Sequence, residues 1–132
     1  MRQGNSKNLS IVIPVFNEIN FLNKLFEQIK TYFNNEKTEI IFVDDGSNDG
    51  SFDVLKELKD KKNYKFIFKL VKLDINSGKG KAIKTGIKNS EGKYILLQDA
   101  DLELDIRDAK EMFDMITANK DIMCIFGSRY LS

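Results

Sequence analysis

The chain has 132 residues, a formal net charge of +1 and no histidine. This length fits one domain, the near-neutral charge excludes a global attraction to nucleic acid or to anionic membranes, and the lack of histidine removes His-based catalytic triads and His-ligated zinc sites. The single cysteine, Cys124, excludes a disulfide framework and favours a reduced, cytoplasmic setting.

The N-terminal part of the chain is expected to be a flexible leader, followed by a strand and a helix. Residues 1–8 are polar and lack the apolar stretch of a signal peptide. The apolar run over 9–15 predicts a strand covered on both faces, and Pro14 should end its ladder because proline has no N–H to donate. After a loop at 16–18, apolar residues recur at helical spacing, which predicts an amphipathic helix over 18–34.

An acidic stretch follows the second predicted strand, at 39–43. One interpretation is that Asp45 faces a ligand and accepts hydrogen bonds from an amide-like N–H, such as a nucleobase edge. The other is a turn over 44–50 that caps the next helix, predicted over 51–61, because Ser, Asn and Asp are good N-cap residues. Both can hold, for different residues. A calcium loop is rejected, because Lys56 stands where an EF-hand needs a bidentate Glu.

A loop rich in glycine and lysine separates the third predicted strand, at 65–73, from a helix that ends near residue 90. The loop lacks the Gly-Lys-Ser/Thr of a P-loop and the third small residue of the dinucleotide fingerprint. Gly78 and Lys79 still stand at a helix N-terminus, where backbone N–H groups and the helix dipole attract anions. We therefore expect these two residues to contact an anionic substrate.

Three carboxylates follow the fourth predicted strand at alternate positions. The apolar run over 94–97 predicts a buried strand, and Asp99, Asp101 and Glu103 come after it. If the extended path continues, these side chains point to one side, where a cation would relieve their repulsion. Oxygen ligands suit Mg²⁺ or Mn²⁺, which would in turn hold a diphosphate. The alternative is that Asp99 or Asp101 caps the following helix.

The last predicted elements are a helix over 106–118 and a strand over 122–126. Arg129 follows this strand, and its guanidinium can hold a phosphate bidentately. Strands that alternate with helices indicate an α/β fold with a parallel sheet, and ligands of such sheets bind beyond the carboxyl ends of the strands. The acids, Arg129 and the loop at 17–18 all fall at such ends, which predicts one shared site.

The order of these motifs resembles glycosyltransferase family 2, the inverting enzymes with the GT-A fold. The matching motifs lie at Ile11–Glu18, Val43–Ser51, Asn76–Ala82, Asp99–Glu103 and Gly127–Tyr130. The last two are most similar to the branch that makes dolichyl- or other polyprenyl-phosphate mannose and glucose. The resemblance implies a three-layer, Rossmann-like GT-A domain over 9–132, with a mostly parallel sheet that binds a nucleotide sugar.

The resemblance also implies a role for each matching residue. The residues that would hold the nucleoside are Pro14, Asn17, Glu18 and Asp45. Asp99, Asp101 and Glu103 would form the DXD-type site for Mg²⁺ or Mn²⁺ and the diphosphate, with Asp101 and Arg129 as catalytic residues. The implied reaction moves a hexose from a donor of the UDP-glucose or GDP-mannose class to a polyprenyl or dolichyl phosphate with inversion, while the metal stabilises the leaving diphosphate.

Members of that family are longer, and the part after their Gly-Ser-Arg-Tyr motif normally supplies the acceptor side. We therefore expect a domain truncated at its C-terminus, with exposed apolar surface and a tendency to self-associate. The alternative function is a catalytically incomplete module that binds nucleotide diphosphate and metal. A receiver-like signalling domain is disfavoured, because the last strand lacks the Lys that such domains need. A full-length enzyme is expected at the cytoplasmic face of a membrane.

Overall fold

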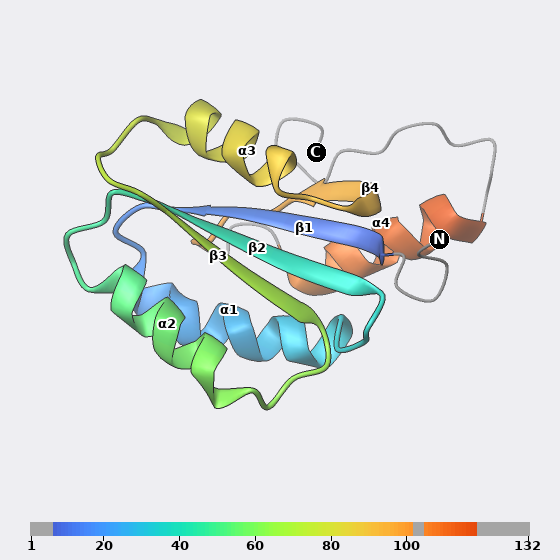
Figure 1. The fold of residues 1–132 in the computed structure, drawn as a ribbon. Coiled ribbons are helices and arrows are strands. Elements are labelled where there is room, and N and C mark those ends of the chain that lie inside the picture. The colour runs from blue at the N-terminus through green and yellow to red at the C-terminus, as the bar shows by residue number, and fades with distance from the viewer. Residues whose placement is uncertain (1–6, 102–104, 119–132) are drawn as a thin grey trace.

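The computed structural model describes residues 7–101 and 105–118, which form strands and helices in strict alternation (Figure 1). The strands are β1 (Lys7–Val15), β2 (Thr38–Asp45), β3 (Ile67–Leu73) and β4 (Gly92–Leu97). The helices are α1 (Ile19–Tyr32), α2 (Ser51–Lys61), α3 (Lys79–Lys88) and α4 (Ile106–Ala118). The strands pair in parallel in the order β3-β2-β1-β4, which confirms the predicted α/β fold.

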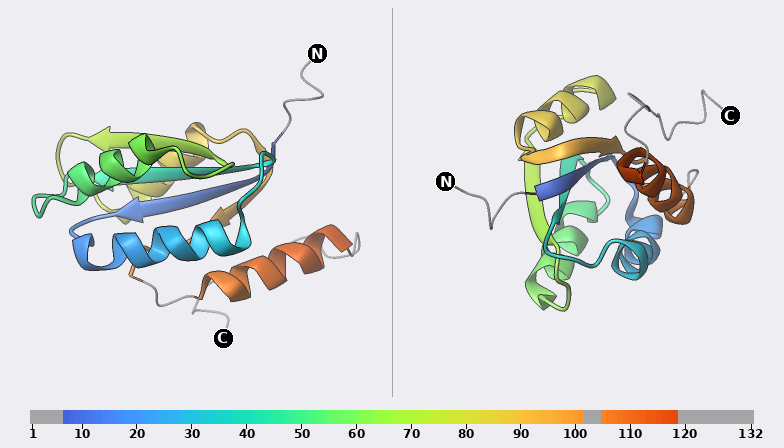
Figure 2. Two further views of the ribbon diagram at one scale, coloured as in Figure 1. Left: turned by 90° about the horizontal axis from the view of Figure 1, so that it is seen from below. Right: turned by 90° about the vertical axis from the view of Figure 1, so that its right-hand side faces the viewer.

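The sheet is the middle of three layers. Helices α1, α2 and α4 cover one face, and α3 covers the other (Figures 1 and 2). Gly86 lets α3 lie close to the sheet, because a Cβ at this position would come within 2.3 Å of Val12 Cγ1. None of the described helices is both long and apolar enough to cross a bilayer.

Strand β1 is apolar from Ile11 to Val15, where both of its faces are covered. Ile11 and Ile13 point into the larger core beneath α1, α2 and α4. Val12 points the other way and packs with Ile41 and Ala82 under α3. All five side chains are fully buried, and each such burial stabilises the fold by about 1.5–3 kcal/mol for a large aliphatic group.

Pro14 does not end β1, contrary to the sequence prediction. Its ladder with β2 continues through Pro14 to the pair Val15–Asp44, whereas the ladder with β4 ends at Val12. Val12 O accepts a hydrogen bond from Gln98 N on the β4 side. Backbone groups alternate sides along a strand, so the nitrogen of Pro14 also points to the β4 side, where no ladder bond is needed.

Strands β2 and β4 also differ from their predictions. β2 continues to Asp45, so Asp44 and Asp45 belong to the strand and are buried. β4 was predicted to be buried, but Ile95 and Leu97 are 44% and 40% exposed. The reason is the order of the sheet: within the described residues β4 is an edge strand, and α3 lies mainly over β1 and β2.

Candidate functional site

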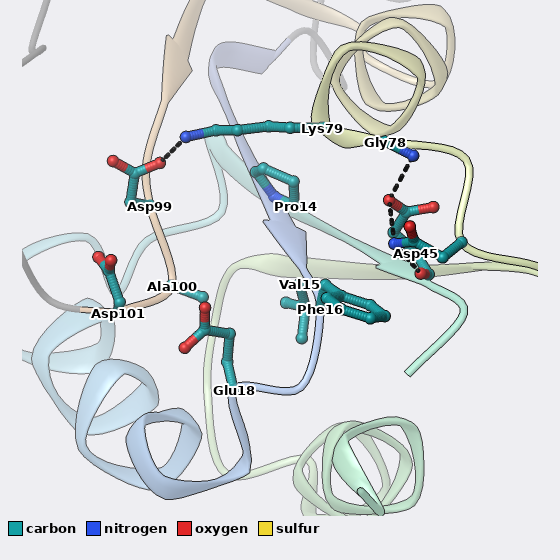
Figure 3. Close-up of a pocket in the computed structure, with 11 residues that line it drawn as sticks. Pro14, Val15, Phe16, Glu18, Asp45, Gly78, Lys79, Asp99, Ala100 and Asp101 are labelled. Carbon is teal, nitrogen blue, oxygen red and sulfur yellow. Dashed lines mark hydrogen bonds and ion pairs between the residues drawn. The ribbon is translucent and has the colours of Figure 1, made fainter. Parts of the chain in front are cut away.

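A pocket of about 320 Å³ lies at the carboxyl ends of β1, β2 and β4 (Figure 3). Its lining comes from four segments that meet at this edge of the sheet, as the topology predicts. The lining residues are Pro14, Val15, Phe16, Glu18, Asp45, Asn76, Gly78, Lys79, Asp99, Ala100 and Asp101. This volume lies at the lower end of the range of roughly 300–1,000 Å³ found for small-molecule sites.

Asn17 joins the loop after β1 to the loop after β2. Its backbone is in the left-handed region, with φ of 53°, which Asn tolerates better than most residues. Its N–H donates to Ser47 Oγ at 2.9 Å, and its Oδ1 accepts from Asn48 N at 2.9 Å. Asn17 therefore positions the pocket rim and lies outside the lining, whereas its neighbour Glu18 lies within it.

Asp49 holds the first turns of two helices. Its Oδ1 accepts hydrogen bonds from Ser51 N and Ser51 Oγ at 2.9 and 2.6 Å, and its Oδ2 accepts from Ile19 N at 3.2 Å. Burial raises the pKa of Asp49, but the hydrogen bonds from Ser51 and Ile19 outweigh this and hold that pKa below its ordinary value. The acidic stretch thus includes the predicted helix-start contact, although Gly50 occupies the N-cap position itself.

The two adjacent strand-end acids have different roles. Asp44 serves the turn, since its Oδ2 accepts from Ser47 N at 3.2 Å. Asp45 lines the pocket and is only 3% exposed. Its Oδ1 accepts from Ser77 N at 2.7 Å, and its Oδ2 accepts from Gly78 N at 2.9 Å and Asn76 Nδ2 at 3.1 Å. These donors compensate the cost of burying the carboxylate.

Gly46 allows the β3–α3 loop to reach Asp45. Its φ is +72°, and a Cβ there would lie 2.4 Å from Asn76 N and 2.6 Å from Ile75 C. No side chain fits in that space without moving backbone atoms. The close approach of the two loops therefore depends on glycine at this position.

Charges in the pocket are mostly negative. Lys79, in the first turn of α3, reaches across the pocket above Pro14 and places Nζ 2.5 Å from Asp99 Oδ1 (Figure 3). The carboxylates of the lining are Glu18, Asp45, Asp99 and Asp101, and Lys79 is the one basic residue among the lining residues. Such a balance attracts cations to the pocket.

The pocket offers two carboxylates, Asp99 and Asp101, of the kind that hold a hard divalent cation together with the phosphates of a ligand. Asp99 and Asp101 come from the segment after β4, and both line the pocket. The sequence prediction assumed that the extended strand continues through these residues, but β4 ends at Leu97. Carboxylate oxygens are the ligands that Mg²⁺ and Mn²⁺ prefer. Within residues 7–101 and 105–118, no three His, Cys, Asp or Glu side chains are grouped closely enough to hold a metal. Glu103 and Arg129 lie outside the described residues, as does the predicted strand at 122–126.

Phe16 is a pocket residue that the sequence reasoning missed. It lines the pocket together with Asp45 (Figure 3), and it is 44% exposed. An aromatic ring that remains exposed beside a polar pocket offers a flat apolar surface to a ligand. Its position in the sequence could have predicted this, because Phe16 directly follows a buried strand and precedes the polar pair Asn17-Glu18.

A family model described as glycosyl transferase family 2 matches residues 10–131. The chain belongs to this family. The match includes every motif on which the sequence resemblance was based, so the predicted family is confirmed.

Curated relatives within the family include polyprenyl-phosphate sugar transferases. The chain is 36% identical to a dolichyl-phosphate beta-glucosyltransferase of Dictyostelium discoideum, over 92% of this chain and 39% of that protein. It is 29% identical to a dolichol-phosphate mannosyltransferase of Pyrococcus furiosus, over 93% of this chain and 33% of that protein. The chain therefore spans about two fifths or less of the length of these relatives.

Solved structures of glycosyltransferases share the fold. S. aureus TarS 1-349 in complex with UDP has a TM-score of 0.72 at 23% identity, over 86% of this chain and 33% of that one. The mannosyltransferase PcManGT from Pyrobaculum calidifontis, in complex with GDP-Man and Mn²⁺, has a TM-score of 0.67 at 22% identity, over 73% of this chain and 28% of that one. At such identities the likeness concerns the fold, and it confirms the predicted GT-A type.

Proposed function

We propose that this chain is the donor-binding part of a glycosyltransferase that moves a hexose from a nucleotide diphosphate sugar to a polyprenyl phosphate. The observation that carries the proposal is the acidic pocket at the carboxyl edge of the sheet, with Asp99 and Asp101 facing it, in a chain of family 2. Two of the solved neighbours are complexes with UDP and with GDP-Man, which supports a donor of this class.

The nucleoside would bind at the end of the pocket formed by β1 and β2. Phe16 offers a ring on which a base can stack, and the carboxylate of Asp45 can accept a hydrogen bond from a base N–H in exchange for one of its loop donors. Pro14 and Glu18 complete this side of the pocket. Asn17 would act indirectly, by holding the loop that carries Phe16 and Glu18.

The diphosphate would bind between α3 and the segment after β4. Gly78 N and Lys79 lie at the start of α3, on the pocket side, where the helix dipole favours anions. Asp99 and Asp101, together with Glu103, would hold Mg²⁺ or Mn²⁺. This ion would supply a counter-charge for the leaving diphosphate. We assign Arg129 to the same phosphates, as its guanidinium geometry favours.

A lipid phosphate is the acceptor that the relatives favour. The Dictyostelium and Pyrococcus proteins are named as dolichyl- and dolichol-phosphate transferases. A phosphate monoester is already ionised near neutral pH, with its second pKa at about 6, so its oxygen can attack without a dedicated base. We propose that the enzyme works at the cytoplasmic face of a membrane, where such an acceptor would be presented.

Calorimetric titration tests the donor half of this proposal. UDP and GDP are titrated into the chain with and without Mn²⁺, and then into the Asp101→Ala variant. We expect metal-dependent binding of one nucleotide and its loss in the variant, since Asp101 faces the pocket without belonging to the core. Absence of binding of both nucleotides to the wild-type chain in the presence of Mn²⁺ would refute the proposal.

A further inference from the structure

The ion pair between Lys79 and Asp99 bridges the pocket from α3 to the segment after β4 (Figure 3). The ammonium lies 2.5 Å from Asp99 Oδ1. The side chain of Lys79 is 55% exposed and that of Asp99 is 18% exposed. The ion pair thus joins a mostly solvent-exposed lysine to a mostly covered carboxylate.

The position of this ammonium overlaps with that of a metal ion on the same oxygen. Mg²⁺ binds carboxylate oxygens at about 2.0–2.1 Å and larger divalent cations at up to about 2.6 Å, a range that reaches the Nζ–Oδ1 distance observed here. An ammonium and a divalent cation on one oxygen would repel each other at close range. Oδ1 of Asp99 can therefore serve either Lys79 or a metal, but not both at full strength.

Lys79 also has a second partner available in the same pocket. It is the first residue of α3, next to Gly78 N, at the end of the helix that attracts anions. A lysine ammonium is a point charge on a flexible stem, and it can reach a new oxygen by rotating its side chain. A diphosphate that enters with a metal would bring such oxygens.

We propose that Lys79 is an exchangeable counter-ion of the donor site: it neutralises Asp99 before the donor arrives and moves to the diphosphate when a divalent cation takes its place on Asp99. This inference rests on the proposed function. The consequence is positive coupling between the binding of metal and of nucleotide diphosphate. Metal alone displaces Lys79 from Asp99 and leaves the ammonium without a new partner, whereas metal together with nucleotide diphosphate provides one. Coupling of this kind acts equally on both ligands.

The test compares Lys79→Met with wild type. Mn²⁺ alone is titrated into each protein, and the electron paramagnetic resonance signal of the free ion measures how much of it is bound. Met keeps an unbranched side chain and removes the charge. We expect the variant to bind Mn²⁺ alone about fivefold more tightly, the value of a partly exposed ion pair. It should bind the preferred nucleotide, UDP or GDP, about tenfold more weakly when Mn²⁺ is present, because a charge-assisted contact is lost. A loss of local structure would weaken both.

Two further variants control this comparison. Lys81→Met removes the same charge from the same helix at an exposed position outside the pocket lining, and we expect no change in either affinity. In the Asp99→Asn background, Lys79→Met should no longer increase Mn²⁺ binding, because the displaced contact is already absent.

The outcomes separate this inference from the function on which it rests. If wild type shows metal-dependent nucleotide binding but Lys79→Met binds Mn²⁺ no more tightly, the exchange is wrong and the donor site stands. If Lys81→Met has the same effect as Lys79→Met, the cause is general charge, and the exchange is again wrong. If wild type binds neither UDP nor GDP with Mn²⁺, both the function and the exchange are wrong.

Discussion

Phe16 lies where the buried strand β1 meets the pocket. It follows Val15, which is fully buried at the end of β1, yet Phe16 itself is 44% exposed and lines the same pocket as Asp45. Exposed aromatic rings contribute little to folding but bind flat ligands by stacking. In the proposed donor site this ring is the one aromatic group of the described lining that can stack on a base.

Phe16→Ala should weaken nucleotide binding without lowering stability by much. Stacking of a base on an aromatic side chain is worth about 1–3 kcal/mol, so we expect the dissociation constant of the preferred nucleotide to rise about tenfold. Calorimetry with Mn²⁺ present measures it. Phe21→Ala is the matched control, since Phe21 is 38% exposed on α1 and lies outside the pocket lining. Equal affinity of the Phe16 variant and wild type would exclude a stacking role.

Asp49 makes the stability of the chain depend on pH. Because folding lowers its pKa, its stabilisation is complete above the unfolded-state pKa of about 3.9 and is lost as the pH falls through the native value. We expect Asp49→Ala to lower the free energy of unfolding by about 1–2 kcal/mol at pH 7 and by progressively less below pH ~4. Urea denaturation at several pH values measures both.

The control for Asp49 is Asp53→Ala in the first turn of α2. The side chain of Asp53 is 76% exposed and lies 3.7 Å from Lys56 Nζ, so its loss should cost less than about 0.5 kcal/mol. A difference between Asp49→Ala and wild type that stays constant down to acid pH would contradict the assigned pKa shift.

Among the elements, the amino ends of the strands are held together by a buried carboxylate. Glu39 in β2 is fully buried, and its Oε2 accepts hydrogen bonds from Ser10 Oγ in β1 and from Glu91 N, both at 2.5 Å. Ser10 Oγ also accepts from Gly92 N at 2.7 Å, and Lys69 Nζ of β3 lies 2.9 Å from Glu39 Oε1. One side chain thus connects all four strands of the described sheet and fixes where β4 begins.

Glu39→Ala should therefore destabilise the chain strongly. Without Glu39, Ser10 Oγ and Glu91 N lose their acceptor, and each buried donor left unsatisfied costs about 1–3 kcal/mol. Lys69 keeps Glu91 and Asn89 O as partners, so the cost comes mainly from these two donors. Chemical denaturation measures this cost. Glu91→Ala is the comparison: its carboxylate is 52% exposed and meets the same Lys69 at 3.0 Å, so we expect less than about 1 kcal/mol. Similar losses for the two variants would show that the network is not centred on Glu39.

Helical periodicity was sufficient to predict α2 and α4 with the bounds found in the structure, because each presents one apolar stripe to the core. The end of β2 was missed because two carboxylates usually mark a loop. Here the burial of Asp45 depends on donors 31 to 33 residues away in the chain. The exposure of Ile95 and Leu97 was missed because strand order, not local pattern, puts β4 at the edge of the sheet formed by the described strands.

For the site, the residue types predicted that acidic side chains lie close together, but they did not predict which residues pair with those side chains. Asp45, Asp99 and Asp101 do line one pocket. The pairing of Lys79 with Asp99 joins residues 20 positions apart through the packing of α3 on the sheet, and no local pattern encodes it. Glu103 and Arg129 remain predictions.

At the scale of the whole molecule, the two faces of the sheet are covered unequally. Of the described helices, α1, α2 and α4 lie on one face and α3 lies on the other (Figure 2). Ile95 and Leu97 pair with Ser10 and Val12 across the β4–β1 ladder, which puts them on the α3 face. With Ile87 of α3, which is 42% exposed, they leave apolar surface on this same face of the sheet, over the part that α3 does not cover. We call these three residues the β4 patch.

We expect a second copy of this chain to cover the β4 patch in concentrated solution. A net charge of +1 gives little repulsion between copies. Within the described residues β4 is an edge strand, and its exposed apolar side chains favour contact with another copy. Sedimentation velocity should show a dimer that dissociates on dilution, and Ile95→Lys should shift the chain to monomer because it places a charge in the contact. Met115→Lys, at a side chain 50% exposed on α4 and outside the patch, should leave the dimer unchanged. A monomer at every concentration, or dissociation caused equally by Met115→Lys, would rule out this contact.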